Sequence, residues 1–91
     1  MTLIQESFRR LFPEKEFDYQ TYLEYNRRLS DFNANIKLAH NRISLHLNLQ
    51  WKDIDDEIKI GLIQTLLLKI FKKRATSSNI ELYHNFIKNI P

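Results

Sequence analysis

The stretch DIDDEIKIGLIQTLLLKIFKKR, residues 53–74, decides the fold, because no other part of the chain is both as long and as apolar. Its first residues are mostly acidic and its last three are basic, which is the charge order that stabilises a helix dipole. Large apolar side chains recur in it at steps of three and four residues: Ile58, Leu62, Ile63, Leu66, Leu67, Ile70 and Phe71. Ile54, Ile60 and Leu68 widen this apolar stripe. The pattern predicts a mostly buried helix over about residues 54–74.

Gly61 is the only glycine of the chain and lies inside this predicted helix. Glycine costs roughly 0.8–1 kcal/mol relative to alanine in a helix interior. One interpretation is that another backbone approaches the helix closely at Gly61, and the other is that the glycine is simply tolerated there.

The first residues predict a short helix over residues 3–12. Thr2 and Gln5 have the spacing of a capping box, and an apolar face follows before a proline ends the run. Arg9 and Arg10 fall on the opposite face, where solvation is one interpretation and contact with a phosphate is the other.

A two-residue period replaces the helical period after Pro13. Apolar and aromatic side chains alternate with polar ones over residues 17–28, as in a strand with one exposed face. Tyr22 is an aromatic residue on the polar face. It fits cross-strand packing or, beside Arg27 and Arg28, stacking on a nucleic-acid base.

The same alternation predicts two more strands, over residues 34–39 and 43–50. Their inward-facing residues change from even to odd numbers between the two segments. Pairing Leu38 with Ile43 therefore leaves a two-residue turn at His40-Asn41, which predicts an antiparallel hairpin.

A last apolar pattern predicts a helix over residues 79–90, in which Ser78 and Glu81 have capping-box spacing. Asp53 is placed to cap the central helix, just after the strand region ends at Trp51. The expected fold class is α+β, as a single domain over residues 1–91. Its order is an N-terminal helix, a three-stranded antiparallel sheet, then two C-terminal helices.

The composition limits the classes of function. A chain of 91 residues without cysteine fits one small domain and offers neither disulfides nor thiolate metal ligands. The longest apolar run is too short to cross a bilayer, and the charged N-terminal residues do not resemble a signal peptide. We therefore expect no membrane association and a cytoplasmic location. The net charge of +3 is only a modest indication of nucleic-acid binding.

The order of these elements resembles the small zinc-metallopeptidase fold of the SprT-like and related zincin families. The resemblance rests on that order, on the frame Ile-x-Leu-x-Leu-x-Leu at residues 43–49, and on Asn79-Ile-Glu-Leu-Tyr-His-Asn-Phe-Ile near the end. In those families the first helix after the strands carries His-Glu-x-x-His. Here Gln64 stands at about the position of the catalytic glutamate. The resemblance therefore implies a scaffold that has lost its zinc site.

The chemistry of a catalytic zinc explains this implication. It requires two imidazoles at i and i+4, a further protein ligand and a carboxylate that accepts a proton. The central helix has no histidine, and His40, His46 and His84 show no ligand spacing. The serines lack a neighbouring base pattern, and one glycine cannot form a Gly-rich phosphate loop. We expect no enzymatic activity, no metal and no cofactor.

Three functional hypotheses follow. The leading one is a non-catalytic interaction or scaffold domain that pairs with a protein partner, a second domain or a second copy of itself. Its contact surface would be apolar side chains that one small sheet does not cover: Trp51, Ile60 and Leu68. The second is a nucleic-acid-binding module using the outer sheet face, with Tyr22, Arg27, Arg28, Lys37 and Arg42, flanked by Lys72, Lys73 and Arg74. The third is a metallohydrolase with unusual ligands.

Overall fold

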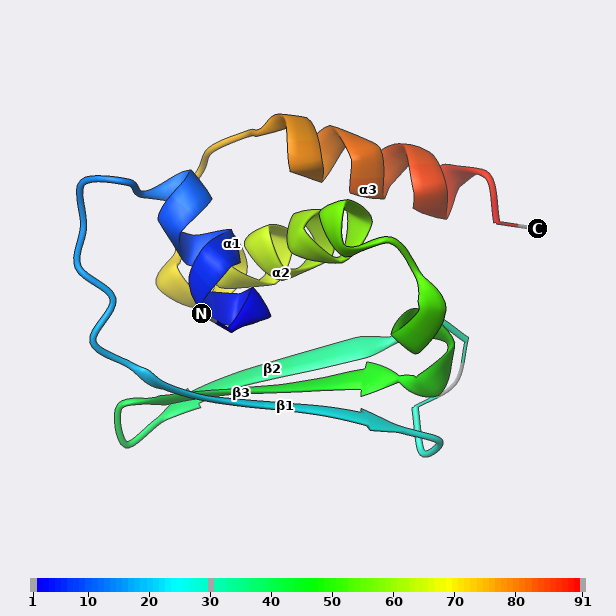
Figure 1. The fold of residues 1–91 in the computed structure, drawn as a ribbon, viewed down its shortest axis with the longest axis horizontal. Coiled ribbons are helices and arrows are strands. Elements are labelled where there is room, and N and C mark those ends of the chain that lie inside the picture. The colour runs from blue at the N-terminus through cyan, green and yellow to red at the C-terminus, as the bar shows by residue number, and fades with distance from the viewer. Residues whose placement is uncertain (1, 30, 91) are drawn as a thin grey trace.

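The computed structural model describes residues 2–29 and 31–90 and has an α+β fold, as the sequence predicts. Figure 1 shows a sheet covered on one face by α1 and α2, with α3 on the far side of α2. The elements in chain order are α1 (Leu3–Leu11), β1 (Gln20–Asn26), β2 (Ala34–Ala39), β3 (Arg42–Asn48), the 3-10 helix η1 (Leu49–Asp53), α2 (Asp56–Phe71) and α3 (Ser78–Lys88).

The sheet has the strand order β1-β3-β2, so the last strand in sequence lies in the centre. β2 and β3 are antiparallel, as predicted, but β1 pairs with β3 in parallel. The prediction of an antiparallel sheet throughout was therefore wrong for β1. Apolar alternation reveals which face of a strand is inward but not which strand lies beside it. The central position explains why Ile43, Leu45 and Leu47 of β3 are all 0% exposed.

The β2–β3 hairpin has the predicted register, with Leu38 opposite Ile43. His40 and Asn41 form the two-residue turn with φ of 52° and 60°, which is the left-handed conformation that such tight hairpins require. The Asn41 side chain donates to the carbonyl of Asp18 at 2.8 Å, and the Asn41 carbonyl accepts from the Gln20 amide at 3.0 Å. The turn is thus tied to the start of β1.

The predicted helix over residues 54–74 is shorter in the structure, because a different aspartate begins it. Asp53 ends η1, and the side chain of Asp55 caps α2 by accepting from the Glu57 amide at 2.8 Å. Lys72 ends α2 in a left-handed conformation, with φ of 55°. Residues 72–74 therefore lie beyond the helix.

Smaller differences in the other boundaries also come from caps and turns. The strand predicted over residues 43–50 ends at Asn48, whose side chain accepts from the Gln50 amide and starts η1. Ser77 and not Ser78 caps α3, by accepting from the Ile80 amide. The remaining predicted segments, 3–12, 17–28 and 79–90, become Leu3–Leu11, Gln20–Asn26 and Ser78–Lys88.

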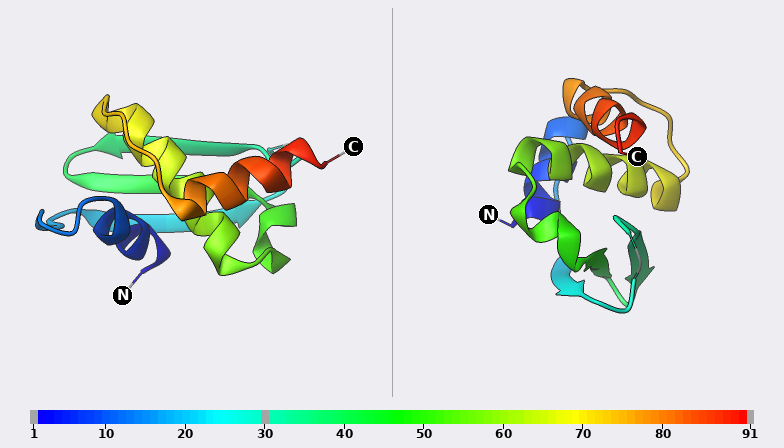
Figure 2. Two further views of the ribbon diagram at one scale, coloured as in Figure 1. Left: turned by 90° about the horizontal axis from the view of Figure 1, so that it is seen from above. Right: turned by 90° about the vertical axis from the view of Figure 1, so that its right-hand side faces the viewer.

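α2 is buried on two sides, since the sheet packs on one and α3 on the other (Figure 2). Its sheet-facing residues Leu62, Ile63 and Leu67 join the main core with β3 and α1. At about 1.5–3 kcal/mol for each fully buried large apolar side chain, this packing outweighs the caps in fixing α2. None of the helices in the described chain combines the length and the apolarity needed to span a bilayer.

Candidate binding surfaces

Gln64, which the zincin resemblance places near the catalytic glutamate, is a structural residue buried in the interior. It is 0% exposed. Its amide nitrogen donates to the Ser7 carbonyl at 3.2 Å, and its amide oxygen accepts from the Ser77 hydroxyl. The side chain thus joins α1, α2 and the cap of α3.

The histidines do not gather around a common point. His40 lies in the hairpin turn, His46 on β3 and His84 on α3. Within residues 2–29 and 31–90, no group of three or more His, Cys, Asp or Glu side chains is arranged to hold a metal ion. These residues therefore do not fit a zinc site.

The three residues predicted to form an apolar contact surface lie in the interior, and this prediction was wrong. Trp51, Ile60 and Leu68 are 0%, 2% and 9% exposed. The indole of Trp51 also donates to the Phe32 carbonyl at 2.8 Å. The prediction considered the sheet alone as cover, whereas α3 forms an additional layer over α2.

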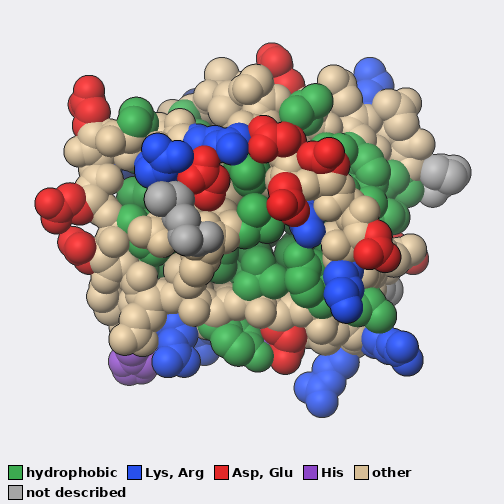
Figure 3. All heavy atoms as spheres, in the orientation of Figure 1, with side chains coloured by type: hydrophobic (Ala, Val, Ile, Leu, Met, Phe, Trp, Pro, Cys, Tyr) green, Lys and Arg blue, Asp and Glu red, His purple; other side chains and the backbone are tan. Residues whose placement is uncertain are grey.

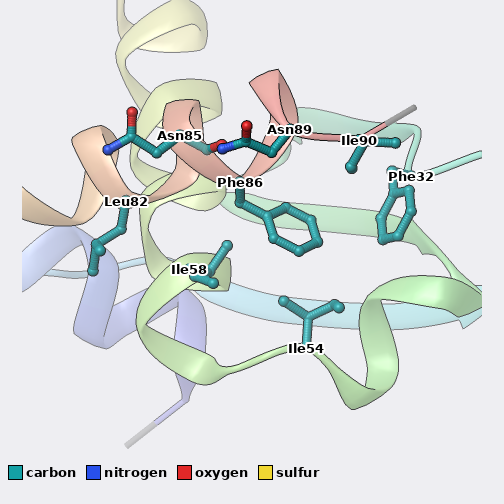
Figure 4. A pocket seen from close by; sticks show the side chains of 8 residues that line it. All are labelled: Phe32, Ile54, Ile58, Leu82, Asn85, Phe86, Asn89 and Ile90. Atoms are coloured by element: carbon teal, nitrogen blue, oxygen red, sulfur yellow. The ribbon is translucent and has the colours of Figure 1, made fainter.

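A different apolar surface is open to solvent, between α3 and the segment that joins η1 to α2. This α3 groove has a volume of about 620 Å³. Its lining consists of six apolar residues and two asparagines, which Figure 4 shows around one hollow: Phe32, Ile54, Ile58, Leu82, Asn85, Phe86, Asn89 and Ile90. Leu82 is 45% exposed, and none of the described residues that line the groove is charged.

An aromatic cluster supports the α3 groove from below. The Phe86 ring lies 5.6 Å from the buried ring of Trp51 and 5.5 Å from Phe32, measured between centroids. The rings of Phe32 and Trp51 meet edge to face at 5.2 Å. The groove therefore has a packed floor and is not a gap left by loose side chains.

Sequence reasoning missed this groove, although one signal was present. The apolar stripe predicted for the inner face of the last helix consists of Ile80, Tyr83, Phe86, Ile87 and Ile90. Leu82 lies outside it, so it is a large apolar residue without an assigned contact. A second apolar face on an amphipathic helix indicates a second packing surface. The participation of Ile54 and Ile58 depends on how the chain turns between η1 and α2.

The sheet face away from the helices is the second candidate surface, and Figure 2 shows that none of the described helices or strands covers it. Tyr22, on the edge strand β1, is 46% exposed on this face. The Glu24 carboxylate accepts from Asn26 and from the Tyr22 hydroxyl, both at 3.1 Å, and lies 3.0 Å from Nδ1 of His46. These partners, Asn26 first, lower the pKa of Glu24, and the hydrogen bond to Glu24 raises the pKa of Tyr22. We call this exposed surface the open sheet face.

The predicted basic residues fall into three separate places. Lys37 and Arg42 lie on the open sheet face near the hairpin turn. Arg27 and Arg28 follow β1 at the opposite end of the sheet, a strand length of roughly 20 Å away. Figure 3 shows Lys and Arg side chains at both lower corners of the molecule, where the sheet lies. Lys72, Lys73 and Arg74 are exposed but follow α2, in the helical layers.

Arg9 and Arg10 are engaged in ion pairs, so neither is simply solvated. Both contact the carboxylate of Glu6, at 3.0 and 2.7 Å, and Arg10 also contacts Glu57 at 2.8 Å. Asn79 adds α3 to this cluster by donating to the Glu57 carbonyl and carboxylate, at 2.9 and 3.0 Å. The cluster links the last turn of α1 to the first turns of α2 and α3.

Comparisons with protein-family models, curated proteins and solved structures find no match to this chain. The relation to SprT-like peptidases therefore stays a prediction.

Proposed function

We propose that this chain is a non-catalytic interaction domain whose α3 groove holds apolar side chains of a protein partner. The observation that carries this proposal is the uncharged groove itself, with Leu82 45% exposed on its rim and an aromatic floor. Contiguous exposed apolar surface is costly for a small domain and typically marks a contact with another molecule. Aromatic anchors in such pockets carry much of the binding energy in protein interfaces.

A second copy of the chain is the partner that best fits this groove. A two-fold interface brings the same surface of each copy together, so its residues must complement themselves. Apolar side chains meet that requirement, and the Asn85 and Asn89 amides do as well, because each can both donate and accept hydrogen bonds. No like charges would meet across such a contact, since the lining is uncharged.

Sedimentation equilibrium over a wide concentration range tests this proposal. We expect reversible self-association that Leu82→Glu weakens about tenfold or more, since a charge would have to be buried in the contact. His84→Glu is the matched control, because His84 is an exposed residue of the same helix outside the groove. A chain that stays monomeric up to millimolar concentration, or variants that behave alike, would contradict the proposal.

The proposed absence of catalysis rests on the residues of α2 that occupy the place of the His-Glu-x-x-His motif in the families that this chain resembles. α2 has no histidine, and the side chain of Gln64 is hydrogen-bonded to Ser7 and Ser77 in the interior. A scaffold can outlive its site. The absence of cysteine also fits a reducing compartment, so the proposed location is the cytoplasm.

A second candidate function is binding of single-stranded nucleic acid on the open sheet face. The specific observation is that Tyr22 lies exposed between basic residues at the two ends of the sheet. An exposed ring can stack on a base while cations contact phosphates. Fluorescence anisotropy with a labelled oligonucleotide should then show affinity that falls steeply with salt. Binding that does not depend on salt, or no binding at low ionic strength, would exclude this candidate.

A further inference from the structure

We propose that a phosphate group binds on the open sheet face, in the small pocket between Lys37 and Arg42. This site is independent of the α3 groove and lies on the opposite side of the sheet from the helices. Its volume is about 330 Å³, and its lining residues are Gln20, Lys37, Ala39, His40, Arg42 and Ser44.

The strand register explains why a pocket forms on an otherwise flat sheet. Arg42 lies opposite Ala39 on β2 and opposite Gln20 on β1, and Ser44 lies opposite Lys37. The small side chains of Ala39 and Ser44 therefore sit diagonally between longer ones. They form the floor, and the longer side chains of Gln20, Lys37 and Arg42 form the walls.

The charges around this floor are not neutralised. Lys37 and Arg42 lie on neighbouring strands, two residues out of register, and neither joins an ion pair with any residue that the structure describes. Three Lys and Arg side chains elsewhere in the described chain, Arg9, Arg10 and Lys59, are in ion pairs. Glu24 is the acidic residue of the strands on this face, and its oxygens are occupied by Asn26, Tyr22 and His46. Two neighbouring unpaired cations repel one another, and an anion between them would remove that repulsion.

The hydrogen-bond donors suit a phosphate group. A guanidinium offers a planar fork to phosphate oxygens, and an ammonium acts as a compact point charge. The Ser44 hydroxyl makes no hydrogen bond within residues 2–29 and 31–90, so it remains available, as does the side-chain amide of Gln20. The tie between Asn41 and Asp18 fixes the hairpin turn beside Arg42, so the site needs little rearrangement to bind.

NMR titration of the full chain with inorganic phosphate tests the site. We expect saturable shifts of the backbone amides of Lys37, Ala39, Arg42 and Ser44. Arg42→Gln and Lys37→Gln should each raise the dissociation constant about tenfold, the effect of losing one charge-assisted hydrogen bond. Lys52→Gln is the matched control, because it removes the same charge from an exposed side chain on η1 and should leave the constant unchanged.

The dispersion of the amide spectrum shows directly whether each variant is folded, and the substituted side chains are exposed. Chemical shifts that do not saturate would overturn the proposal, and so would a loss of phosphate affinity in Lys52→Gln equal to that in Arg42→Gln. Either result would mean that phosphate responds only to the net charge of the chain and not to a specific site.

Two further ligands distinguish the source of the phosphate. Adenosine monophosphate binding as tightly as inorganic phosphate, with an oligothymidylate no tighter, would identify an isolated phosphate group as the ligand. Tighter binding of the oligothymidylate, with shifts that extend to the amides of Arg27 and Arg28, would identify the phosphodiester backbone. Both results support a phosphate site, and they assign it to different ligands.

Discussion

Gly61 of α2 lies directly against the backbone of Asn79 in α3: a β-carbon on Gly61 would be 1.9 Å from the Asn79 carbonyl oxygen. It would also be 2.8 Å from the β-carbon of Tyr83. Both distances are far below van der Waals contact, so any larger residue here must push the two helices apart. The only glycine of the chain is thus what permits the close packing of α2 and α3.

Gly61→Ala should destabilise the fold by about 2–4 kcal/mol, because the displacement of α3 outweighs the roughly 0.8–1 kcal/mol that alanine gains in helix propensity. Urea denaturation followed by circular dichroism measures the change. Lys69→Ala, at an exposed position of the same helix, should change stability by less than about 0.5 kcal/mol. A Gly61→Ala variant more stable than the original chain would show that α2 and α3 can accommodate a β-carbon here, contrary to this prediction.

Gln64→Glu should destabilise the fold at neutral pH by about 3 kcal/mol, since a buried carboxylate would face the Ser7 carbonyl in place of a donor. Burial raises the pKa of such a carboxyl in the folded state, so the native state binds the proton more tightly than the unfolded state. The loss should therefore be small at about pH 4 and grow as pH rises. Thermal melts at pH 4 and pH 8 measure it, and an equal loss at both would be inconsistent with a buried charge.

The Arg10 cluster should contribute to stability at neutral pH and lose that contribution in acid. Hydrogen bonds from Arg10 lower the pKa values of both Glu6 and Glu57. A carboxyl whose pKa is lowered by folding stabilises the native state above its ordinary pKa of 4.5, and the stabilisation is lost as pH falls below that value. Arg10→Gln should therefore lower the melting temperature at pH 7 and have less effect at pH 3.

Arg9→Gln provides a comparison for the Arg10 variant, because Arg9 pairs with Glu6 alone among residues 2–29 and 31–90 and makes no ion pair with α2 there. Its effect at pH 7 should be the smaller of the two. If Arg10→Gln lowered the melting temperature equally at pH 3 and pH 7, the effect would come from lost packing and not from the ion pairs.

Calorimetric titration with zinc or nickel at neutral pH should reveal no stoichiometric site of micromolar affinity. The histidines lie on separate elements, and no described group of three donors is arranged around one point. Stoichiometric micromolar binding would revive the hypothesis of a metallohydrolase with unusual ligands, and substitution of His46 and His84 in turn would then locate the ligands.

The sequence predicted those features that follow from local periodicity and from backbone sterics. Alternation identified the inward side chains of the strands, and the parity change identified the His40-Asn41 turn and its register. The interpretation of Gly61 as a site of close backbone approach is confirmed by its contact with Asn79. The strand faces and the turn depend only on a few neighbouring residues. The interpretation of Gly61 depends on the cost of a glycine inside a helix, which close approach of another backbone explains.

Features set by long-range packing could not be read in the same way. A strand beside β3 has the same alternation whether it runs parallel or antiparallel, so the direction of β1 carried no local signal. The burial of Trp51, Ile60 and Leu68 depends on α3, which shields these side chains from solvent. Their apolar character alone does not show which element lies over them. The α3 groove likewise arises only where three segments distant in sequence meet, around Phe32, residues 54–58 and α3.

The parallel pairing of β1 with β3 also implies an order of assembly. The β2–β3 hairpin has a loop of two residues. Pairing of Gln20 with Arg42 instead requires closure of a much longer loop, which includes all of β2. Short loops close fast and at low entropic cost, and contacts between distant residues form more slowly. We therefore expect the hairpin to be organised in the folding transition state and β1 to be added after it, so that substitutions in β1 mainly accelerate unfolding.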